Sequence, residues 1–371
     1  MVPSTASEVV KIDLDYVCTT LTREFEAAAG SRFLITGGGG FLGYYLVQAI
    51  SHWNTANPEL PIPVTVLDNF MRGVPVWLSD LAASTPDTLD LRQQDIVEPI
   101  PNDLEDVGYI IHAASIASPI YYRKYPLETM DANVLGLRNL LEWSVNRGAG
   151  QVKGFLNYST SEIYGDPTPE NIPTSETYRG NVSCTGPRAC YDESKRYGET
   201  LSVNFANQHD VPIRIARPFN NYGPGLKITD GRALPDFARN VLTDQDLVLF
   251  SDGSPTRTFC YVADAIIGYF LILFRGRNGE PYNIGVEAPE ISMRHFAERV
   301  IEIARRHFDY KGALRFANSE DAEYLTDNPN RRCPNIEKAR VELGYDPKIG
   351  LDVGLERSLI WYAENQSAED G

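Results

Sequence analysis

The stretch Arg32-Phe-Leu-Ile-Thr36-Gly37-Gly-Gly-Gly40-Phe41-Leu-Gly43, which continues as Tyr44-Tyr-Leu-Val-Gln-Ala-Ile50, decides the fold of this 371-residue chain. The apolar run predicts a buried strand, the glycines predict a tight turn, and the apolar spacing after Gly43 predicts a helix. The glycines satisfy both GxxGxxG, from Gly37, and GxGxxG, from the next residue. Such a turn lets the backbone approach a pyrophosphate at the N-terminus of the helix. The stretch therefore predicts a dinucleotide-binding unit.

Further apolar runs follow, and helical patterns or loops separate them. The runs cover 63–68, 107–112, 154–159 and 211–216, with a weaker one at 89–95 and a late one at 282–285. A helical pattern through 296–301 follows the last run. Alternation of this kind predicts an α/β fold, a Rossmann-type doubly wound parallel sheet. Beyond Arg217 the rhythm breaks, and 218–225 and 251–257 are rich in turn residues. This change predicts a smaller C-terminal substrate-binding region.

The same changes in pattern suggest boundaries. We expect an N-terminal extension over 1–30, with one helical piece near its end. We expect a Rossmann domain over 31–217, which the chain enters again over 258–285. The substrate-binding domain is expected over 218–257 and 286–365.

The composition excludes some classes of binding partner. The chain has 34 Lys and Arg against 50 Asp and Glu, a net charge of −16. Such a surface repels phosphate backbones and anionic lipid, so we expect neither nucleic acid nor membrane as a partner. No stretch approaches the roughly 20 apolar residues of a membrane helix. The five cysteines are scattered without zinc spacing, so the sequence predicts no metal and a reducing, cytoplasmic location.

Asp68 stands at the end of the second expected strand. An acid at this position suits a ribose 2′-hydroxyl and repels a 2′-phosphate. The sequence therefore favours NAD over NADP. Arg72 lies close by in the sequence and, as a cation, argues for NADP.

Tyr191 and Lys195 stand at i and i+4, on one face of an expected helix. An ammonium near a phenol, together with a bound nicotinamide cation, lowers the pKa of the phenol. The phenolate then takes a proton from a substrate hydroxyl. Alone, this pair is no more than a common helix-surface pattern, but the hydroxyl-rich run from Tyr158 to Glu162, with Thr160 in it, strengthens the reading.

With these residues the chain resembles the extended short-chain dehydrogenase/reductases of the nucleotide-sugar epimerase/dehydratase type, and among them the UDP-glucuronate decarboxylase (UDP-xylose synthase) family. The most specific similarity is Gly186-Pro-Arg-Ala-Cys-Tyr-Asp-Glu-Ser-Lys-Arg196. Supporting segments are 159–165, 95–99, 117–120, 215–220, 230–232, 256–261 and 332–336, so the resemblance spans about 32–360.

The resemblance implies three sets of site residues. The catalytic set is Thr160, Glu162, Tyr191, Lys195 and Arg332. The NAD-binding set is Gly37, Gly40, Phe41, Leu42, Gly43, Asp68, Asn69, Asp95, Ile96, Ala113, Tyr191 and Lys195. The set that binds the UDP-sugar is Ser118, Tyr122, Asn220, Arg232, Arg257 and Arg332. A homodimer is also implied.

The resemblance further implies a reaction. Tyr191 would deprotonate the 4-OH of UDP-glucuronate while C4 gives hydride to NAD. The 4-keto acid would lose carbon dioxide, and return of the hydride would give UDP-xylose and regenerate NAD. Glu162 and Arg332 would lie near C5 and the carboxylate, where an arginine fork suits a sugar carboxylate.

Alternatives stay open at this point. A UDP-glucuronate 4-epimerase shares the Tyr191–Lys195 pair, and departures from the family pattern at Gly39, Tyr44, Tyr45 and Ser194 admit a decarboxylase or epimerase of another acidic nucleotide sugar. A 4,6-dehydratase is disfavoured because Ser161 stands where its acid would be. The non-enzyme alternative is an NAD-sensing or scaffold protein.

Overall fold

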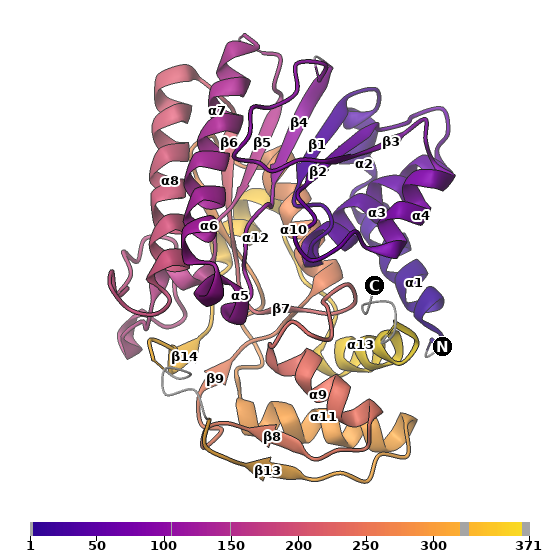
Figure 1. The fold of residues 1–371 in the computed structure, drawn as a ribbon, viewed down its shortest axis with the longest axis vertical. Helices are drawn as coiled ribbons and strands as arrows, with labels where there is room; N and C mark the ends of the chain where they lie inside the picture. The colour runs from indigo at the N-terminus through magenta and orange to yellow at the C-terminus, as the bar shows by residue number, and fades with distance from the viewer. Residues whose placement is uncertain (1–2, 105, 149, 320–325, 366–371) are drawn as a thin grey trace.

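The computed structural model describes residues 3–104, 106–148, 150–319 and 326–365. A seven-stranded parallel sheet forms its centre, in the order β11-β6-β5-β4-β1-β2-β3 (Figure 1). Its strands are β1 (Arg32–Thr36), β2 (Val64–Asp68), β3 (Leu89–Gln93), β4 (Val107–His112), β5 (Gly154–Tyr158), β6 (Ile213–Pro218) and β11 (Pro281–Ile284). The order reverses between β1 and β4, where doubly wound sheets bind ligands at the carboxyl ends of their strands. The predicted Rossmann-type fold is confirmed.

Helices cover both faces of the sheet because successive side chains of a strand point to opposite sides. In β1, Phe33 and Ile35 belong to one hydrophobic cluster and Leu34 to another. The helices of this part are α3 (Phe41–Ala56), α4 (Val76–Ser84), α5 (Pro119–Lys124), α6 (Pro126–Asp131), η1 (Ala132–Gly136), α7 (Leu137–Asn146), α8 (Ala189–His209) and α10 (Val262–Arg275), with the short turns η2 (Ser161–Tyr164) and η3 (Pro169–Asn171). Figure 1 shows α7 and α8 on one face and α3 on the other.

The smaller region lies below the sheet in Figure 1, beyond the carboxyl ends of its strands. Its strands pair in short sets, with β7 beside β10, β8 beside β13, and β9 between β12 and β14. The strands are β7 (Asn221–Tyr222), β8 (Leu247–Leu249), β9 (Thr256–Arg257), β10 (Cys260–Tyr261), β12 (Ile291–Ser292), β13 (Leu314–Phe316) and β14 (Arg331–Arg332). The helices are α9 (Ala233–Leu242), α11 (Met293–His307), α12 (Glu337–Leu343) and α13 (Leu351–Asn365). This region closes the site from the side opposite the sheet.

The N-terminal segment is more ordered than the single helical piece expected from the sequence. It forms α1 (Ala6–Thr20) and α2 (Thr22–Ala28), and the side chain of Thr5 accepts the backbone N–H of Glu8 as an N-cap. Helix α1 packs on α3, α10 and α13 through an apolar stripe that includes Val9 and Val17. The acidic residues between these apolar positions masked the stripe in the sequence.

One buried carboxylate ties this segment to both parts of the molecule. Asp13 is fully buried and accepts hydrogen bonds from the hydroxyls of Tyr45 in α3 and Tyr261 in β10, each at 2.6 Å. Its other oxygen pairs with Arg357 of α13, also at 2.6 Å. Helix α1 therefore joins the glycine-turn helix to the C-terminal region.

The helices of the described ranges were compared with what a membrane span requires. None of them combines the length and the apolar character that a bilayer span requires.

Candidate active site

A single cavity of about 1070 Å³ opens at the carboxyl ends of the strands, beside the reversal point between β1 and β4. Every residue predicted for the site from the sequence lines it, whichever part of the chain it comes from. The roles assigned to these residues follow from the resemblance and stay predictions; the structure shows that they share one cavity.

The glycine turn between β1 and α3 leaves room for a ligand because side chains cannot fit there. Gly37 has φ +72°, and a Cβ added to it would lie 2.6 Å from the backbone of Ala114. A Cβ on Gly43 would overlap the carbonyl of Gly38, so helix and turn are packed backbone to backbone. Gly40 is the N-cap of α3, and the first turn of this helix lines the cavity with its positive dipole end. This cradle fits the pyrophosphate of a dinucleotide.

Two carboxylates, Asp68 and Asp95, line the cavity with the glycine turn. Asp68 accepts the backbone N–H groups of Gly39 at 2.9 Å and Phe70 at 2.8 Å, and burial raises its pKa. Asp95 accepts from the side chain of Asn69 at 2.9 Å. Two acids at the ends of β2 and β3 suit hydroxyl groups and oppose a 2′-phosphate.

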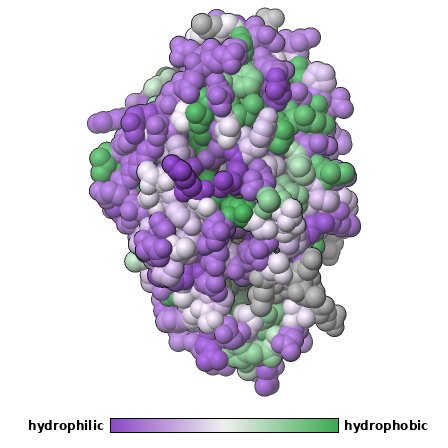
Figure 2. Space-filling model, turned by 90° about the vertical axis from the view of Figure 1, so that its left-hand side faces the viewer, coloured by the Kyte–Doolittle hydropathy of each residue, from purple (hydrophilic) through white to green (hydrophobic). Residues whose placement is uncertain are grey.

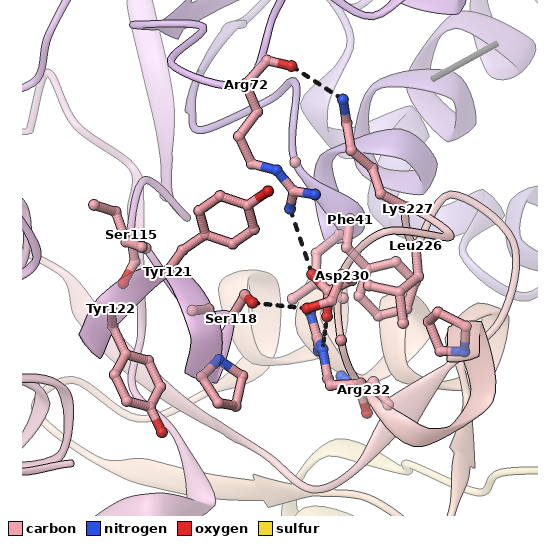
Figure 3. Close-up of a pocket in the computed structure, with 18 of the residues that line it drawn as sticks. Phe41, Arg72, Ser115, Ser118, Tyr121, Tyr122, Leu226, Lys227, Asp230 and Arg232 are labelled. Carbon is pink, nitrogen blue, oxygen red and sulfur yellow. Dashed lines mark hydrogen bonds and ion pairs between the residues drawn. The ribbon is translucent and has the colours of Figure 1, made fainter. Parts of the chain in front are cut away.

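Arg72, the residue that argued for NADP in the sequence, is engaged elsewhere (Figure 3). Its guanidinium lies 4.5 Å from the ring centre of Tyr121 and 3.4 Å from the carboxylate of Asp230. Asp230 also pairs with Arg232 at 2.5 Å, and its carbonyl accepts the hydroxyl of Ser118 at 2.8 Å. Arg72 therefore links the cofactor side of the cavity to the loop of the smaller region.

The predicted Tyr–Lys pair lies at the start of α8, under the end of β5. Lys195 Nζ is 5.8 Å from the ring centre of Tyr191 and donates to the carbonyl of Tyr158 at 2.8 Å. Thr160 follows β5 and hydrogen-bonds the side chain of Tyr191. The ring of Tyr122 stacks on that of Tyr191 with centres 5.1 Å apart. The phenol is therefore held between a hydroxyl and an aromatic face.

Burial dominates the protonation of this pair. It raises the pKa of Tyr191 to about 12, partly offset by the hydrogen bond from Thr160, and lowers the pKa of Lys195 to about 7. The side chains of the protein alone do not bring the phenol toward neutrality. The sequence-based expectation assigned that shift to Lys195 together with the positive charge of a bound nicotinamide.

Glu162 in η2 is bound by two guanidinium groups. Arg332 of β14 forms a bidentate ion pair with it, and Arg188, which precedes α8, donates to Oε2 at 2.5 Å. Although burial alone would raise the pKa of Glu162, Arg332 and then Arg188 lower it to about 2. Glu162 is therefore a carboxylate at neutral pH.

Arg257 and Asn220, two further residues predicted to bind the substrate, also line the cavity. Arg257 of β9 donates to the carbonyls of Thr256 and Pro329, and burial, followed by the nearby Arg332, lowers its pKa to about 9. Asn220 has φ +40° and donates to the carbonyl of Thr258 at 3.0 Å, so its amide also holds a turn.

Comparisons with known proteins agree with this geometry. The model of the NAD dependent epimerase/dehydratase family matches residues 33–285. The chain belongs to this family. UDP-glucuronic acid decarboxylase 6 of Arabidopsis thaliana is 37% identical over 328 residues, covering 87% of this chain and 86% of that protein. UDP-glucuronic acid decarboxylase 1 of Xenopus tropicalis is 35% identical over 335 residues, covering 89% and 72%.

Solved structures of this epimerase/dehydratase fold are also similar. The dTDP-glucose 4,6-dehydratase of Streptomyces venezuelae, solved with NAD bound, is 26% identical with a TM-score of 0.76, covering 90% of this chain and 98% of that one. The UDP-glucuronic acid 4-epimerase of Bacillus cereus, solved with UDP-glucuronic acid and NAD, is 25% identical with a TM-score of 0.72, covering 90% and 99%. NAD as the cofactor is confirmed by the family and fits the glycine cradle.

Sequence reasoning gave no role to Arg188, although it lies within the most specific similar segment. It stands three residues before Tyr191, so the start of α8 brings both to the cavity. That spacing is the signal that was available.

The structure shows no group of three or more His, Cys, Asp or Glu arranged for a metal ion among the residues it describes.

Proposed function

We propose that this member of the epimerase/dehydratase family decarboxylates UDP-glucuronate to UDP-xylose through a 4-keto intermediate. The observation that carries the proposal is the Glu162–Arg188–Arg332 cluster, which lies on the same cavity as the Tyr191–Lys195 pair. The pair suits oxidation of a sugar hydroxyl, and the guanidinium groups suit a sugar carboxylate. The decarboxylases among the relatives support this choice.

At the sugar C4, the phenol oxygen of Tyr191 takes the hydroxyl proton. Thr160 hydrogen-bonds the phenol and lowers its pKa. The Nζ of Lys195 lies 5.8 Å from the ring centre of Tyr191, and a positive charge there favours the phenolate. When NAD is bound, it supplies the hydride acceptor that C4 needs and returns the hydride afterwards. The positions of Tyr191 and Lys195 under β5 fix where the reacting carbon has to lie.

At C5, the guanidinium fork of Arg332 receives the substrate carboxylate. Loss of carbon dioxide from the 4-keto acid moves the electron pair of the C5–C6 bond into the C4 carbonyl, and C5 then takes one proton. Glu162 is ionised, since its pKa is about 2, so it does not supply a proton of its own. We assign to it the orientation of a water molecule that protonates C5.

Proton NMR of the protein with UDP-glucuronate and catalytic NAD tests the proposal. Formation of a UDP-pentose with release of carbon dioxide supports it. Formation of UDP-galacturonate would replace it with the 4-epimerase reaction, to which one structural relative also points. No turnover of UDP-glucuronate, while NAD binds, would refute it and leave another acidic nucleotide sugar or a binding role.

We also propose that the protein is a homodimer paired through the face of α6, η1 and α8. Large apolar side chains are exposed there, namely Leu127, Met130, Leu135 and Tyr197. Figure 2 views the α8 side of the molecule and shows hydrophobic groups between hydrophilic ones. Light scattering after size exclusion tests this, with twice the chain mass expected.

The cytoplasmic location predicted from the sequence stays a prediction, and cell fractionation tests it.

A further inference from the structure

The ion cluster around Glu162 contains one more cation than the sequence analysis assigned. Arg332 already occupies both oxygens of Glu162, and Arg188 adds a third contact, to Oε2 at 2.5 Å. The two arginines come from distant segments, the start of α8 and β14. One carboxylate therefore holds two guanidinium groups.

Further charged groups border the cluster, among them the carboxylates of Asp166, near Arg257, and Asp327, near Asp192. Arg257 adds a further guanidinium, bonded to carbonyl groups and Asn328. Asp192, one helical turn after Arg188, lies 3.8 Å from its Nε, and burial followed by the charge of Glu162 raises the pKa of Asp192 to about 7. Arg332 and Arg188 thus bind Glu162 directly, and Arg188 also lies beside Asp192.

A second carboxylate at this cluster has to compete with Glu162. A guanidinium offers a flat fork that binds one carboxylate in bidentate fashion, and Glu162 uses the fork of Arg332. If a sugar carboxylate takes that fork, Glu162 needs another cation, because an unpaired buried charge is costly. Arg188 is the guanidinium that already touches it.

We propose that Arg188 retains Glu162 when the substrate carboxylate takes Arg332, and thereby makes the site selective for uronic acid nucleotide sugars over neutral ones. This inference rests on the proposed function, because it concerns the same carboxylate subsite. Arg188 acts through Glu162 and is a positioning residue.

The surroundings of Arg188 favour a fixed position rather than a swinging one. Its side chain is 14% exposed and lies between Glu162 and Asp192. Its Nε is buried without a hydrogen-bond partner, as is the hydroxyl of the nearby Tyr122. Since Tyr191 follows three residues later, the start of α8 holds the carboxylate subsite and the catalytic phenol at a set distance.

The test measures binding of UDP-glucuronate and UDP-glucose to the NAD-loaded protein by calorimetry. All proteins carry Y191F, which removes the phenol that the reaction requires, and the parent is compared with R188M, R188K and the double variant R188M/E162Q. We expect R188M to lower the affinity for UDP-glucuronate by about 10- to 100-fold, as loss of a buried charge partner does, and that for UDP-glucose by less than about threefold. R188K should restore part of the loss. E162Q in the R188M background should restore more, because a neutral amide no longer competes for Arg332.

The matched control is R138M, which removes an exposed arginine of α7 that pairs with Glu142. It should leave both affinities unchanged. Equal losses for the two sugars, or no rescue by E162Q, would overturn the inference and make Arg188 a purely structural residue. Turnover of UDP-glucuronate by the wild type is read separately, so a protein that binds the uronate selectively without decarboxylating it refutes the proposed reaction and leaves the role of Arg188 measurable.

Discussion

Replacing Lys195 with Met should stabilise the protein freed of NAD, although it removes a residue of the candidate active site. Lys195 is buried, with 6% of its surface exposed, and burial lowers its pKa from 10.5 to about 7. At about 1.4 kcal/mol per pKa unit, holding this ammonium in the fold costs about 4–5 kcal/mol at and below neutral pH. Met removes the cost and also loses the hydrogen bond to the carbonyl of Tyr158, worth about 1 kcal/mol. The expected net gain is about 3–4 kcal/mol.

The stability difference between K195M and the wild type depends on pH. Between pH 7 and 10.5 the unfolded chain binds the proton that folded Lys195 lacks, so raising the pH stabilises the wild type relative to K195M. The advantage of the variant is therefore largest below pH 7 and shrinks as the pH rises toward 10.5. Urea unfolding of both proteins at pH 6.5, 8 and 9.5 measures it, and the difference between them cancels the other titrating groups.

A control variant separates this effect from a general benefit of Met. K153M removes an exposed lysine that donates to Ser31, and it should change the free energy of unfolding by less than about 0.5 kcal/mol. A K195M protein that is less stable than the wild type at every pH, or whose advantage does not change with pH, would refute the reasoning. Confirmation would show that the catalytic ammonium is kept at the expense of stability.

Three further outcomes are expected. D13A removes the shared acceptor of Tyr45, Tyr261 and Arg357, so it should lower the free energy of unfolding by about 3–5 kcal/mol in urea titrations; a loss below about 1 kcal/mol would show that α1 is not anchored there. G43A places a Cβ on the carbonyl of Gly38, and it should weaken NAD binding at least about tenfold by calorimetry while the circular dichroism spectrum stays native; unchanged affinity would argue against the cradle. E162Q keeps the shape of Glu162 without its charge and should slow release of carbon dioxide by about 100-fold or more, and a full rate would remove Glu162 from the chemistry.

Much of the fold could be predicted because its signals are local. Six strands of the central sheet were found as apolar runs, since strands buried on both faces read as hydrophobic stretches. The edge strand β3, LDLRQ, is only partly buried and gave a weaker signal. The glycine turn and the Tyr191–Lys195 spacing are also local, and both lie in the cavity. In contrast, α1 escaped the sequence analysis because its buried Asp13 looks like one more surface acid until Tyr45, Tyr261 and Arg357 are placed around it.

Periodicity and residue spacing predicted the sheet, the glycine turn and the Tyr191–Lys195 pair, because these signals act over a few residues. Glu162, Arg332 and the other substrate residues followed from the resemblance to a known family. Tertiary structure alone decided the charge state of the site. Glu162, Arg188 and Arg332 meet only when η2, the start of α8 and β14 converge, and their contact keeps Glu162 ionised. Folding likewise lowers the pKa of Lys195, since removing water from a charge is a property of the assembled interior.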